Sequence, residues 1–280
     1  MGGGGLPFPI PTGRRAGGGG GLILLLVVGA FLLFGRGLFG GDGGTGIQPG
    51  LDGFGQAEEA RPGQVPEGDT VAGLVGAVSK HAQDFWTTEF QQAGREYRRA
   101  KVVLFTGGTQ TGCGPGSSAT GPFYCPLDER VYIDLSFFRE LSNRFGAPGD
   151  FAQAYVVSHE IAHHVQKVLG IEPQVRERQR SNPDEANDLS VRMELQADCF
   201  AGVWSHSVYL DTQSGQGNLA LEEGDIEEGL NAAAAVGDDR LGARSPESWT
   251  HGSSELRVKW FKRGFESGQP GDCDTFSSGI

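Results

Sequence analysis

The sequence predicts an α+β domain, mostly helical with a small sheet, preceded by a single N-terminal transmembrane helix. Apolar residues recur at three- and four-residue steps over several long segments, which is the spacing of a buried helix face. Two short runs, residues 101–106 and 130–135, are rich in β-branched and aromatic residues, as strands are. These patterns divide the chain into a short cytoplasmic N-terminus (1–15), a transmembrane anchor (16–35), a flexible Gly-rich linker (36–68) and one domain (69–280).

The apolar segment near the start predicts where the domain lies. Residues 16–35 carry no charge, and Leu22–Phe34 are almost wholly apolar, so the segment can span a hydrocarbon core of roughly 30 Å as a helix. Arg14 and Arg15 precede it, which places the N-terminus in the cytoplasm and the domain outside, in a periplasm or at a cell surface. A cleaved signal peptide is the alternative, although no Ala-x-Ala site follows.

Helices and strands are expected on both sides of the central part of the domain. Residues 71–90 predict an amphipathic helix, and Lys101–Thr106 predict a strand. Arg130–Leu135 alternate in polarity and predict a half-buried strand at a sheet edge. Residues 221–235 predict a helix with a solvated acidic face. That face consists of Glu222, Glu223, Asp225, Glu227 and Glu228.

Residues Asp150–Leu169 predict a helix that carries the most specific motif of the chain. The first of them can cap the helix, with Gln153 completing a capping box. The expected core face consists of Ala154, Ile161, Val165 and Val168. On another flank His159 and His163 lie one turn apart, with Glu160 beside them. Two imidazoles and an adjacent carboxylate predict a zinc site in which Glu160 takes a proton from water.

A second helix is expected from Asn182 to about Tyr209, after a polar loop. Asn182 can cap it, and Glu185 completes a capping box. The apolar face contains Met193, Ala197, Phe200 and Trp204. Glu194 and Asp198 stand one turn apart on a neighbouring strip. We predict Glu194 as the third zinc ligand and Asp198 as the acceptor for the outer N–H of a zinc-bound histidine. Asp198 as the ligand instead is the alternative.

The remaining histidines are candidates for catalysis or packing. His251 precedes a final helix and is interpreted as a catalytic residue that stabilises a developing oxyanion. The apolar face of that helix contains Leu256, Trp260 and Phe261. Capping this helix is the alternative role for His251, and Tyr155 is a second catalytic candidate. His164 and His206 are expected to pack rather than to bind metal.

Four cysteines allow three pairings into two disulfides, which are compatible with an oxidising compartment. We favour Cys113 with Cys125, which bracket a Gly/Pro/Ser-rich loop expected to lack regular structure. Cys199 with Cys273 would then tie the C-terminal tail to the helix that carries Glu194. The absence of paired C-x-x-C makes a structural zinc ribbon a poor interpretation.

The net charge of −12 excludes nucleic acid as a natural partner and favours solubility. Other catalytic sites lack their parts, since the sequence has no Walker loop and no Gly-x-Ser-x-Gly elbow. The composition does not predict an oligomeric state.

The chain resembles the neutral zinc metallopeptidases of the YpfJ type in four phrases that occur in order over residues 69–276. These are Gly121–Pro126, Ser158–Gln166, Glu194–Cys199 and Thr250–Ser254. The spacing of Glu194 and Asp198 is also similar to that of glutamate-ligand zinc peptidases. The resemblance implies a zincin-like fold and peptidase activity on a peptide or protein substrate, and we predict an endopeptidase with one catalytic zinc ion. It also implies that substrate pairs beside the strand at 130–135, and the alternative is an ordinary sheet strand with no substrate role. The alternative function is a non-catalytic, zinc-stabilised module that binds peptides or serves as an envelope scaffold.

Overall fold

The computed structural model describes residues 70–280, apart from 216, 218, 243–244, 246–247 and 278–279. The segments for which we predicted a cytoplasmic N-terminus (1–15), a membrane anchor (16–35) and a linker (36–68) lie outside the described residues. Within the described part, no helix combines the length and the apolar character needed to cross a bilayer.

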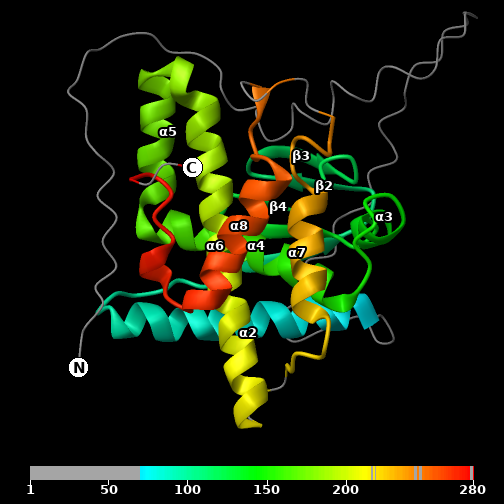
Figure 1. Cartoon of the computed structure of the whole chain (residues 1–280). Coiled ribbons are helices and arrows are strands. Elements are labelled where there is room, and N and C mark those ends of the chain that lie inside the picture. Colours follow the sequence, from blue (N-terminus) through cyan, green and yellow to red (C-terminus); the bar gives the residue numbers. More distant parts are fainter. Residues whose placement is uncertain (1–69, 216, 218, 243–244, 246–247, 278–279) are drawn as a thin grey trace, which may run out of the picture.

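The described residues form a mainly helical α+β structure with one small sheet and a separate hairpin (Figure 1). The helices are α2 (Thr70–Gln92), α3 (Phe137–Asn143), α4 (Asp150–Leu169), α5 (Ile171–Ser181), α6 (Ala186–Ser214), α7 (Asp225–Ala235) and α8 (Ser254–Ser267). Two 3₁₀ turns are η1 (Pro183–Glu185) and η3 (Pro270–Asp272). The strands are β1 (Lys101–Phe105), β2 (Gly108–Thr111), β3 (Gly114–Ser117), β4 (Phe123–Cys125) and β5 (Arg130–Asp134). The predicted fold class is therefore confirmed at this level.

Helix α4 lies at the centre of the domain. It packs against α2, α6 and α7, and it also contacts strands β4 and β5. In Figure 1, α2 runs across the lower part of the domain and α6 extends past it, while α7 and α8 lie side by side in front of α4. The motif on α4 is thereby held between helices that come from distant parts of the chain.

Strand β5 is the central strand of its sheet, so the prediction of an edge strand was wrong. The order is β1-β5-β4, with β1 parallel and β4 antiparallel to β5. Residues Val131–Asp134 are all buried, so the alternating polarity does not mark a solvated face. The loop between Cys113 and Cys125, expected to be irregular, supplies β4 and the second strand of the β2-β3 hairpin. A three-residue strand in a Gly/Pro-rich segment is too short to give a periodic signal.

The start of α4 is capped differently from our prediction. Gly149, rather than Asp150, is the N-cap, and its φ of 115° suits glycine. Gln153 donates its side-chain N–H to the Gly149 carbonyl at 3.3 Å instead of completing a capping box. The backbone N–H of Phe151 donates to Glu228 of α7 at 3.1 Å. The backbone N–H of Phe151, which has no partner within the helix, is thus satisfied by a carboxylate 77 positions away. Glu228 was expected on the solvated acidic face of residues 221–235.

The segment between α4 and α6 is helical, which corrects the expected polar loop. Helix α5 buries Ile171 and Val175 against Leu189 of α6. Asn182 makes no side-chain capping bond, and Glu185 pairs with an arginine of α5 instead. The few apolar residues of α5 are not enough to reveal its period from the sequence. Helix α6 continues to Ser214, beyond the predicted end at Tyr209.

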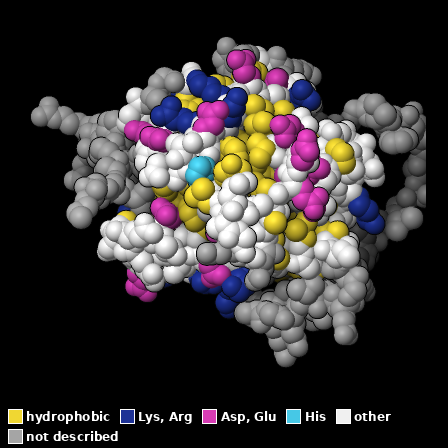
Figure 2. All heavy atoms as spheres, turned by 60° about the horizontal axis from the view of Figure 1, so that its bottom comes forward, with side chains coloured by type: hydrophobic (Ala, Val, Ile, Leu, Met, Phe, Trp, Pro, Cys, Tyr) yellow, Lys and Arg dark blue, Asp and Glu magenta, His cyan; other side chains and the backbone are white. Residues whose placement is uncertain are grey.

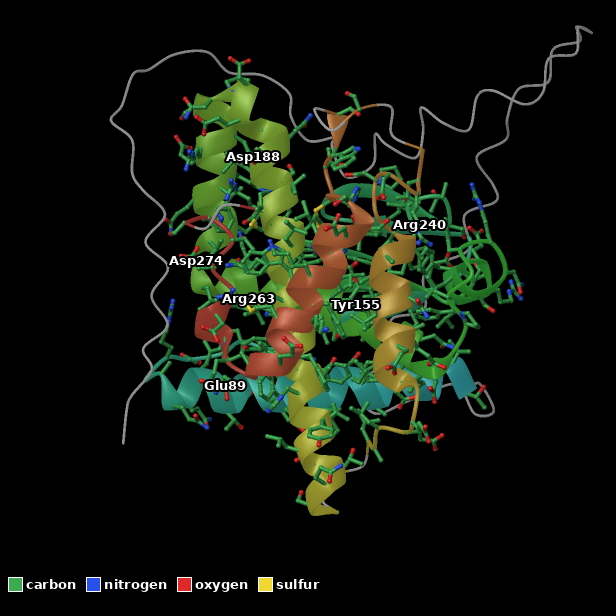
Figure 3. The ribbon with its side chains drawn as sticks, in the orientation of Figure 1. Glu89, Tyr155, Asp188, Arg240, Arg263 and Asp274 are labelled. Carbon is green, nitrogen blue, oxygen red and sulfur yellow. A yellow bond between two sulfur atoms is a disulfide. The ribbon has the colours of Figure 1, made fainter. Side chains whose placement is uncertain are left out.

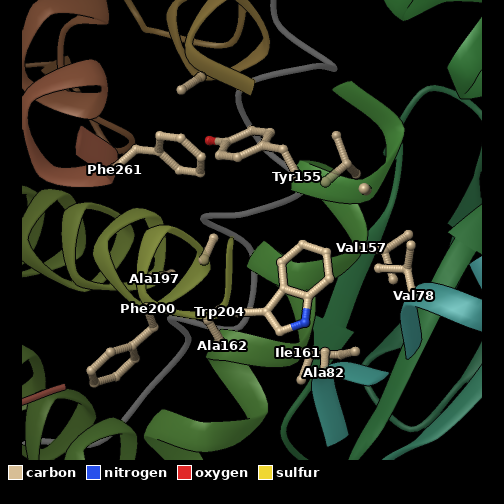
Figure 4. Close-up of a cluster of buried hydrophobic side chains, with 14 of the residues drawn as sticks. Val78, Ala82, Tyr155, Val157, Ile161, Ala162, Ala197, Phe200, Trp204 and Phe261 are labelled. Atoms are coloured by element: carbon tan, nitrogen blue, oxygen red, sulfur yellow. The ribbon is translucent and has the colours of Figure 1, made fainter. Parts of the chain in front are cut away.

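Aromatic side chains fill the interior between α4, α6 and α8 (Figure 4). The ring of Tyr155 meets that of Phe261 edge to face, with centroids 5.5 Å apart. Trp204 is 1% exposed and stacks on Phe151. Burying such side chains stabilises the domain by about 1.5–3 kcal/mol each relative to exposure.

Helices α6 and α8 cross at two glycines. A Cβ atom on Gly202 would lie 2.0 Å from the carbonyl oxygen of Phe261, and one on Gly264 would lie 1.9 Å from that of Cys199. Real Cβ atoms do not approach backbone so closely. The backbones can therefore pack at this distance only because both positions lack a side chain.

The outer surface is mixed rather than basic on the face shown in Figure 2. Acidic, basic and hydrophobic side chains are interspersed there, without a continuous Lys/Arg surface. Exposed large hydrophobic residues of the described part include Leu127, Tyr209 and Leu210.

Candidate metal centre

Three side chains from α4 and α6 converge in the interior. The Nε2 atom of His159 lies 3.1 Å from Oε2 of Glu194, and Nε2 of His163 lies 3.4 Å from Oε1 of the same carboxylate. One donor atom from each of these residues lies within 4.8 Å of the others. The two imidazole rings are perpendicular, with centroids 4.8 Å apart. The structure thus brings together the three residues that the sequence predicts as metal ligands.

The charges at this centre are strongly coupled. Burial alone would raise the pKa of Glu194, but the facing imidazoles of His163 and His159 hold it well below its usual value. Burial lowers the pKa of His159, yet the carboxylates of Asp198 and Glu194 raise it to about 9. Burial also lowers the pKa of His163, and Glu194 reverses that shift. Without a metal, the carboxylates therefore favour the protonated form of both imidazoles.

Asp198 lies behind His159, on the side away from Glu194. Its Oδ1 atom is 2.9 Å from Nδ1 of His159, although the approach is too oblique to count as an aligned hydrogen bond. Asp198 also accepts a hydrogen bond of 2.5 Å from the hydroxyl of Tyr155. The predicted pairing of Asp198 with the outer nitrogen of a histidine is thus present as a close contact. Asp198 does not belong to the group of converging metal-ligand atoms, which weighs against it as the ligand.

Arg257 of α8 completes this cluster and was not predicted. Its Nε donates to Oδ2 of Asp198 at 2.8 Å and its Nη2 donates to Oδ1 at 2.9 Å. Nη2 also donates to the Tyr155 hydroxyl at 3.2 Å and lies 3.8 Å from Glu194. Burial raises the pKa of Asp198, but the guanidinium and His159 lower it below its usual value. Tyr155 lies in the interior behind α7 and α8 (Figure 3), so its hydroxyl serves this cluster rather than an open surface.

A sequence signal for Arg257 does exist. Arg257, Trp260, Phe261 and Gly264 are all buried and recur at three- and four-residue steps, so they form the inward face of α8. We had placed Leu256 on that face, but it is only partly buried. An arginine within an apolar helical face requires a buried partner, which would have indicated an acidic residue nearby.

His163 has a neutral outer partner. Its Nδ1 atom lies 2.9 Å from the side-chain oxygen of Gln166, one turn further along α4. Gln166 in turn contacts Gln196 of α6 at 3.1 Å. Neither glutamine was predicted. Gln166 is one turn from His163 on α4, whereas Gln196 is two residues from Glu194 and lies on a different face of α6.

Glu160 is 8% exposed and lies in the same electrostatic environment. Burial raises its pKa, whereas the two motif histidines oppose the shift. Its carboxyl group therefore binds a proton more readily than an ordinary surface glutamate does.

His251 lies near the centre on a loop organised by Asp238. Oδ2 of Asp238 accepts the backbone N–H groups of Thr250, His251 and Gly252 at 2.8, 2.7 and 2.9 Å. Its Oδ1 atom lies 3.2 Å from Nδ1 of His251. The imidazole of His251 is one of the groups that lower the pKa of Glu194, which places it within electrostatic reach of the ligands. Helix α8 is capped by Ser253, so the alternative of a capping role for His251 was wrong.

The other predicted side chains have structural contacts. His164 contacts the Tyr124 hydroxyl and the Arg98 carbonyl through its two ring nitrogens. Burial lowers its pKa, which favours the neutral form of this imidazole. His206 contacts the carbonyl of Phe265 at 2.7 Å. Both predictions of packing roles are confirmed.

Both predicted disulfides are present. Cys113 is bonded to Cys125, and Cys199 is bonded to Cys273. The first holds β4 to the preceding hairpin region, and the second joins α6 to the C-terminal tail.

The donor set fits zinc. Two imidazoles and one carboxylate are a ligand set of catalytic zinc sites, which leave a coordination position for water or substrate. The Nε2 atoms face inward, while each outer Nδ1 has a protein acceptor nearby, as is usual for metal-binding histidines. A second group of carboxylates, Asp150, Asp225 and Glu228, also lies within 4.8 Å. That group lacks nitrogen ligands, and Glu228 already serves as the cap of α4.

Comparisons with known proteins agree with this centre. The chain is 52% identical over 221 residues to the protein YpfJ of Escherichia coli strain K12, covering 77% of this chain and 75% of YpfJ. It is 48% identical over 191 residues to the Mycobacterium tuberculosis protein Rv2575, covering 65% of this chain and 64% of that protein. No solved structure gave a significant match. A family model described as "Putative neutral zinc metallopeptidase" matches residues 1–276. The chain therefore belongs to this neutral zinc metallopeptidase family.

Proposed function

We propose that this protein is a zinc-dependent endopeptidase with one catalytic ion held by His159, His163 and Glu194. The observation that carries the proposal is the convergence of two Nε2 atoms and one carboxylate beside Glu160. When bound, zinc supplies a Lewis acid that polarises a peptide carbonyl and makes water easier to deprotonate. The family membership supports a peptide or protein as the substrate.

The protein's own residues divide the remaining work. Glu160 accepts a proton from the attacking water and delivers it to the amine that leaves, which suits a carboxyl group whose pKa is raised by burial. His251, held by Asp238, donates to the negative charge that develops on the carbonyl oxygen. Asp198 keeps His159 in the tautomer whose Nε2 lone pair faces inward. Arg257 keeps Asp198 ionised.

Zinc content and cleavage, measured together on the full-length protein, test this assignment. The variant Glu160→Gln should keep about one zinc per chain and lose cleavage of a peptide library by at least about 100-fold, the scale of a lost acid–base group. Glu177→Gln is the matched control, because Glu177 is exposed on α5 and pairs with the exposed Arg180 of the same helix. His163→Ala should lose both zinc and cleavage. Unchanged cleavage by Glu160→Gln would disprove the assigned role of Glu160.

Zinc binding without cleavage would support the other function, a module that holds a peptide or envelope partner. Such a module has no need of a proton acceptor beside the metal ligands, whereas Glu160 is buried there. A wild-type protein that binds zinc but cleaves no peptide in a broad library would contradict the enzyme proposal.

We also propose that residues 16–35 tether the domain to a membrane and that residues 69–280 lie outside the cytoplasm. The uncharged apolar segment after Arg14 and Arg15 supports the tether. The two disulfides support an oxidising compartment. Cell fractionation of the full chain and of a variant lacking residues 16–35 tests the proposal. Recovery of the full chain in the soluble fraction, with residues 16–35 still present, would contradict it.

A further inference from the structure

A hydrogen-bonded chain leads from His163 to the C-terminal tail. Nδ1 of His163 contacts Oε1 of Gln166 at 2.9 Å. The side-chain N–H₂ of Gln166 donates to the Met193 carbonyl at 2.8 Å and to Oε1 of Gln196 at 3.1 Å. The N–H₂ of Gln196 donates to the carbonyl of Cys273 at 3.0 Å. Gln166, Gln196 and Cys273 are each 0% exposed, so water does not replace these bonds.

Each contact fixes the orientation of the next group. An imidazole that offers the Nε2 lone pair to a metal carries its proton on Nδ1 and must donate there. Gln166 must then turn its oxygen to His163 and its N–H₂ to Gln196. Gln196 must accept with its oxygen and therefore points its N–H₂ at Cys273. Reversing either amide would place two donors or two acceptors face to face.

The outer end of this chain is fixed to α6. Cys273 is bonded to Cys199, and Thr275 donates its hydroxyl to the Arg192 carbonyl at 2.7 Å. Arg192, Gln196 and Cys199 follow one another by four and three residues, so they lie on one face of α6. In Figure 1 the tail, drawn in red, runs beside α6 and α8. The disulfide therefore places the Cys273 carbonyl opposite Gln196.

We propose that Gln166 and Gln196 are positioning residues for His163 and that the Cys199–Cys273 disulfide helps to set the zinc affinity of the site. This inference rests on the proposed zinc site, but it does not depend on peptide cleavage. The two ligand histidines are then oriented by different means. His159 faces an ionised carboxylate, whereas His163 depends on neutral amides that are anchored by the tail.

Zinc dissociation constants of the full-length protein, measured by competition with a chromophoric chelator, test the inference. Gln166→Met should weaken zinc binding by about 10- to 100-fold, as is usual for the loss of an outer partner of a metal-binding histidine. Gln166→Glu keeps an acceptor for His163 but loses the N–H₂ that donates to Met193 and Gln196, so it should restore only part of the affinity. Gln196→Met, which retains the side-chain length, should weaken binding by about fivefold, the effect of one neutral hydrogen bond.

The two disulfides provide a matched pair of variants. Replacement of Cys199 and Cys273 by serine should weaken zinc binding several-fold, whereas replacement of Cys113 and Cys125 should leave it unchanged. The Cys113–Cys125 disulfide serves as the control because it does not belong to the chain of contacts to His163. Both variants are compared at temperatures where circular dichroism shows them folded, and Gln196→Met decides the question if the first does not fold.

A spectroscopic measurement separates positioning from general stability. The Nδ1–H signal of His163 in the zinc-loaded protein, detected by ¹⁵N NMR, should shift in Gln166→Met and Gln196→Met, while that of His159 should stay in place. Unchanged zinc affinity and an unchanged His163 signal in Gln196→Met would overturn the inference. A wild-type protein that binds no zinc would overturn both this inference and the proposed function.

Discussion

The buried ion pair between Arg257 and Asp198 should be the most sensitive polar contact of this domain. Both side chains are almost inaccessible, at 3% and 0% exposure, and two N–H groups of the guanidinium reach the carboxylate at 2.8 and 2.9 Å. Replacing Arg257 by Met would leave the Asp198 charge with the Tyr155 hydroxyl and a misaligned contact to His159. Removing one partner of such a pair costs about 3–5 kcal/mol.

The loss should be measured as the free energy of unfolding by urea denaturation, in zinc and in chelator. A domain is commonly stable by about 5–15 kcal/mol, so Arg257→Met should shift the midpoint by a large fraction. The loss should appear in both conditions, because in chelator the raised pKa of His159 lets a proton beside Asp198 take over part of the compensation that the metal gives. Arg180→Met is the control, since its partner Glu177 is 70% exposed and such surface pairs contribute about 0–1 kcal/mol.

A double variant distinguishes the loss of a charge partner from the loss of packing. Adding Asp198→Asn to Arg257→Met removes the charge left without a partner and should recover part of the stability in chelator. A cost of less than about 1 kcal/mol for Arg257→Met in chelator would refute the reasoning. So would an equal cost for the single and the double variant.

Three further outcomes follow from the same contacts. Gly202→Ala should lower the melting temperature strongly in calorimetry, since its Cβ would lie 2.0 Å from a backbone oxygen of α8. If the variant melted at the same temperature as the wild type, the two helices could separate at little cost. Burial raises the pKa of Asp238, but its bonds to His251 and to backbone N–H groups lower it below the usual value near 4. The contribution of Asp238 to stability is therefore complete above about pH 4 and is lost as the pH falls through the lowered pKa. Asp238→Asn should flatten the plot of unfolding free energy against pH only below about pH 4, and a difference in slope confined to higher pH would contradict this. Zinc binding near pH 7 should release protons, because His159 has a pKa of about 9 without metal. Calorimetric titration in buffers of different ionisation enthalpy measures the number of protons released per zinc bound, and a value of zero would contradict a protonated His159 in the metal-free protein.

Local patterns predicted the parts of the centre that lie on a single helix. The spacing of His159, Glu160 and His163 is a property of α4 alone, and the i,i+4 relation of Glu194 and Asp198 is a property of α6 alone. Both were available from the sequence because helix geometry fixes which side chains share a face. To join these two strips into one centre, the prediction needed only a connection long enough for the second helix to pack against the first.

Contacts between distant elements were less accessible. Arg257 reaches Asp198 only because α8 packs on α6 at two glycines, and no periodicity reports that crossing. Glu228 caps α4 from α7 for the same kind of reason. The error over β5 has a similar origin, because its second neighbour β4 is a short strand whose pairing depends on tertiary structure. Sequence periodicity indicates which side chains share one face of a helix or strand. Which element packs against that face depends on the tertiary structure.

Charge balance explains why this interior tolerates so many ionisable groups. Glu160, Glu194 and Asp198 contribute three negative charges when ionised, and Arg257 contributes one positive charge, which leaves a formal charge of 1 − 3 = −2 among these four buried or largely buried groups. Isolated charges are expensive to bury, so this excess requires compensation. Without metal, protons supply it. The facing carboxylates outweigh burial and raise the pKa values of His159 and His163, while burial raises that of Glu160. A divalent cation balances the same charge with both imidazoles neutral, and neutral imidazole is the form that coordinates zinc. The buried carboxylates and the single guanidinium thus favour a doubly charged ion on electrostatic grounds.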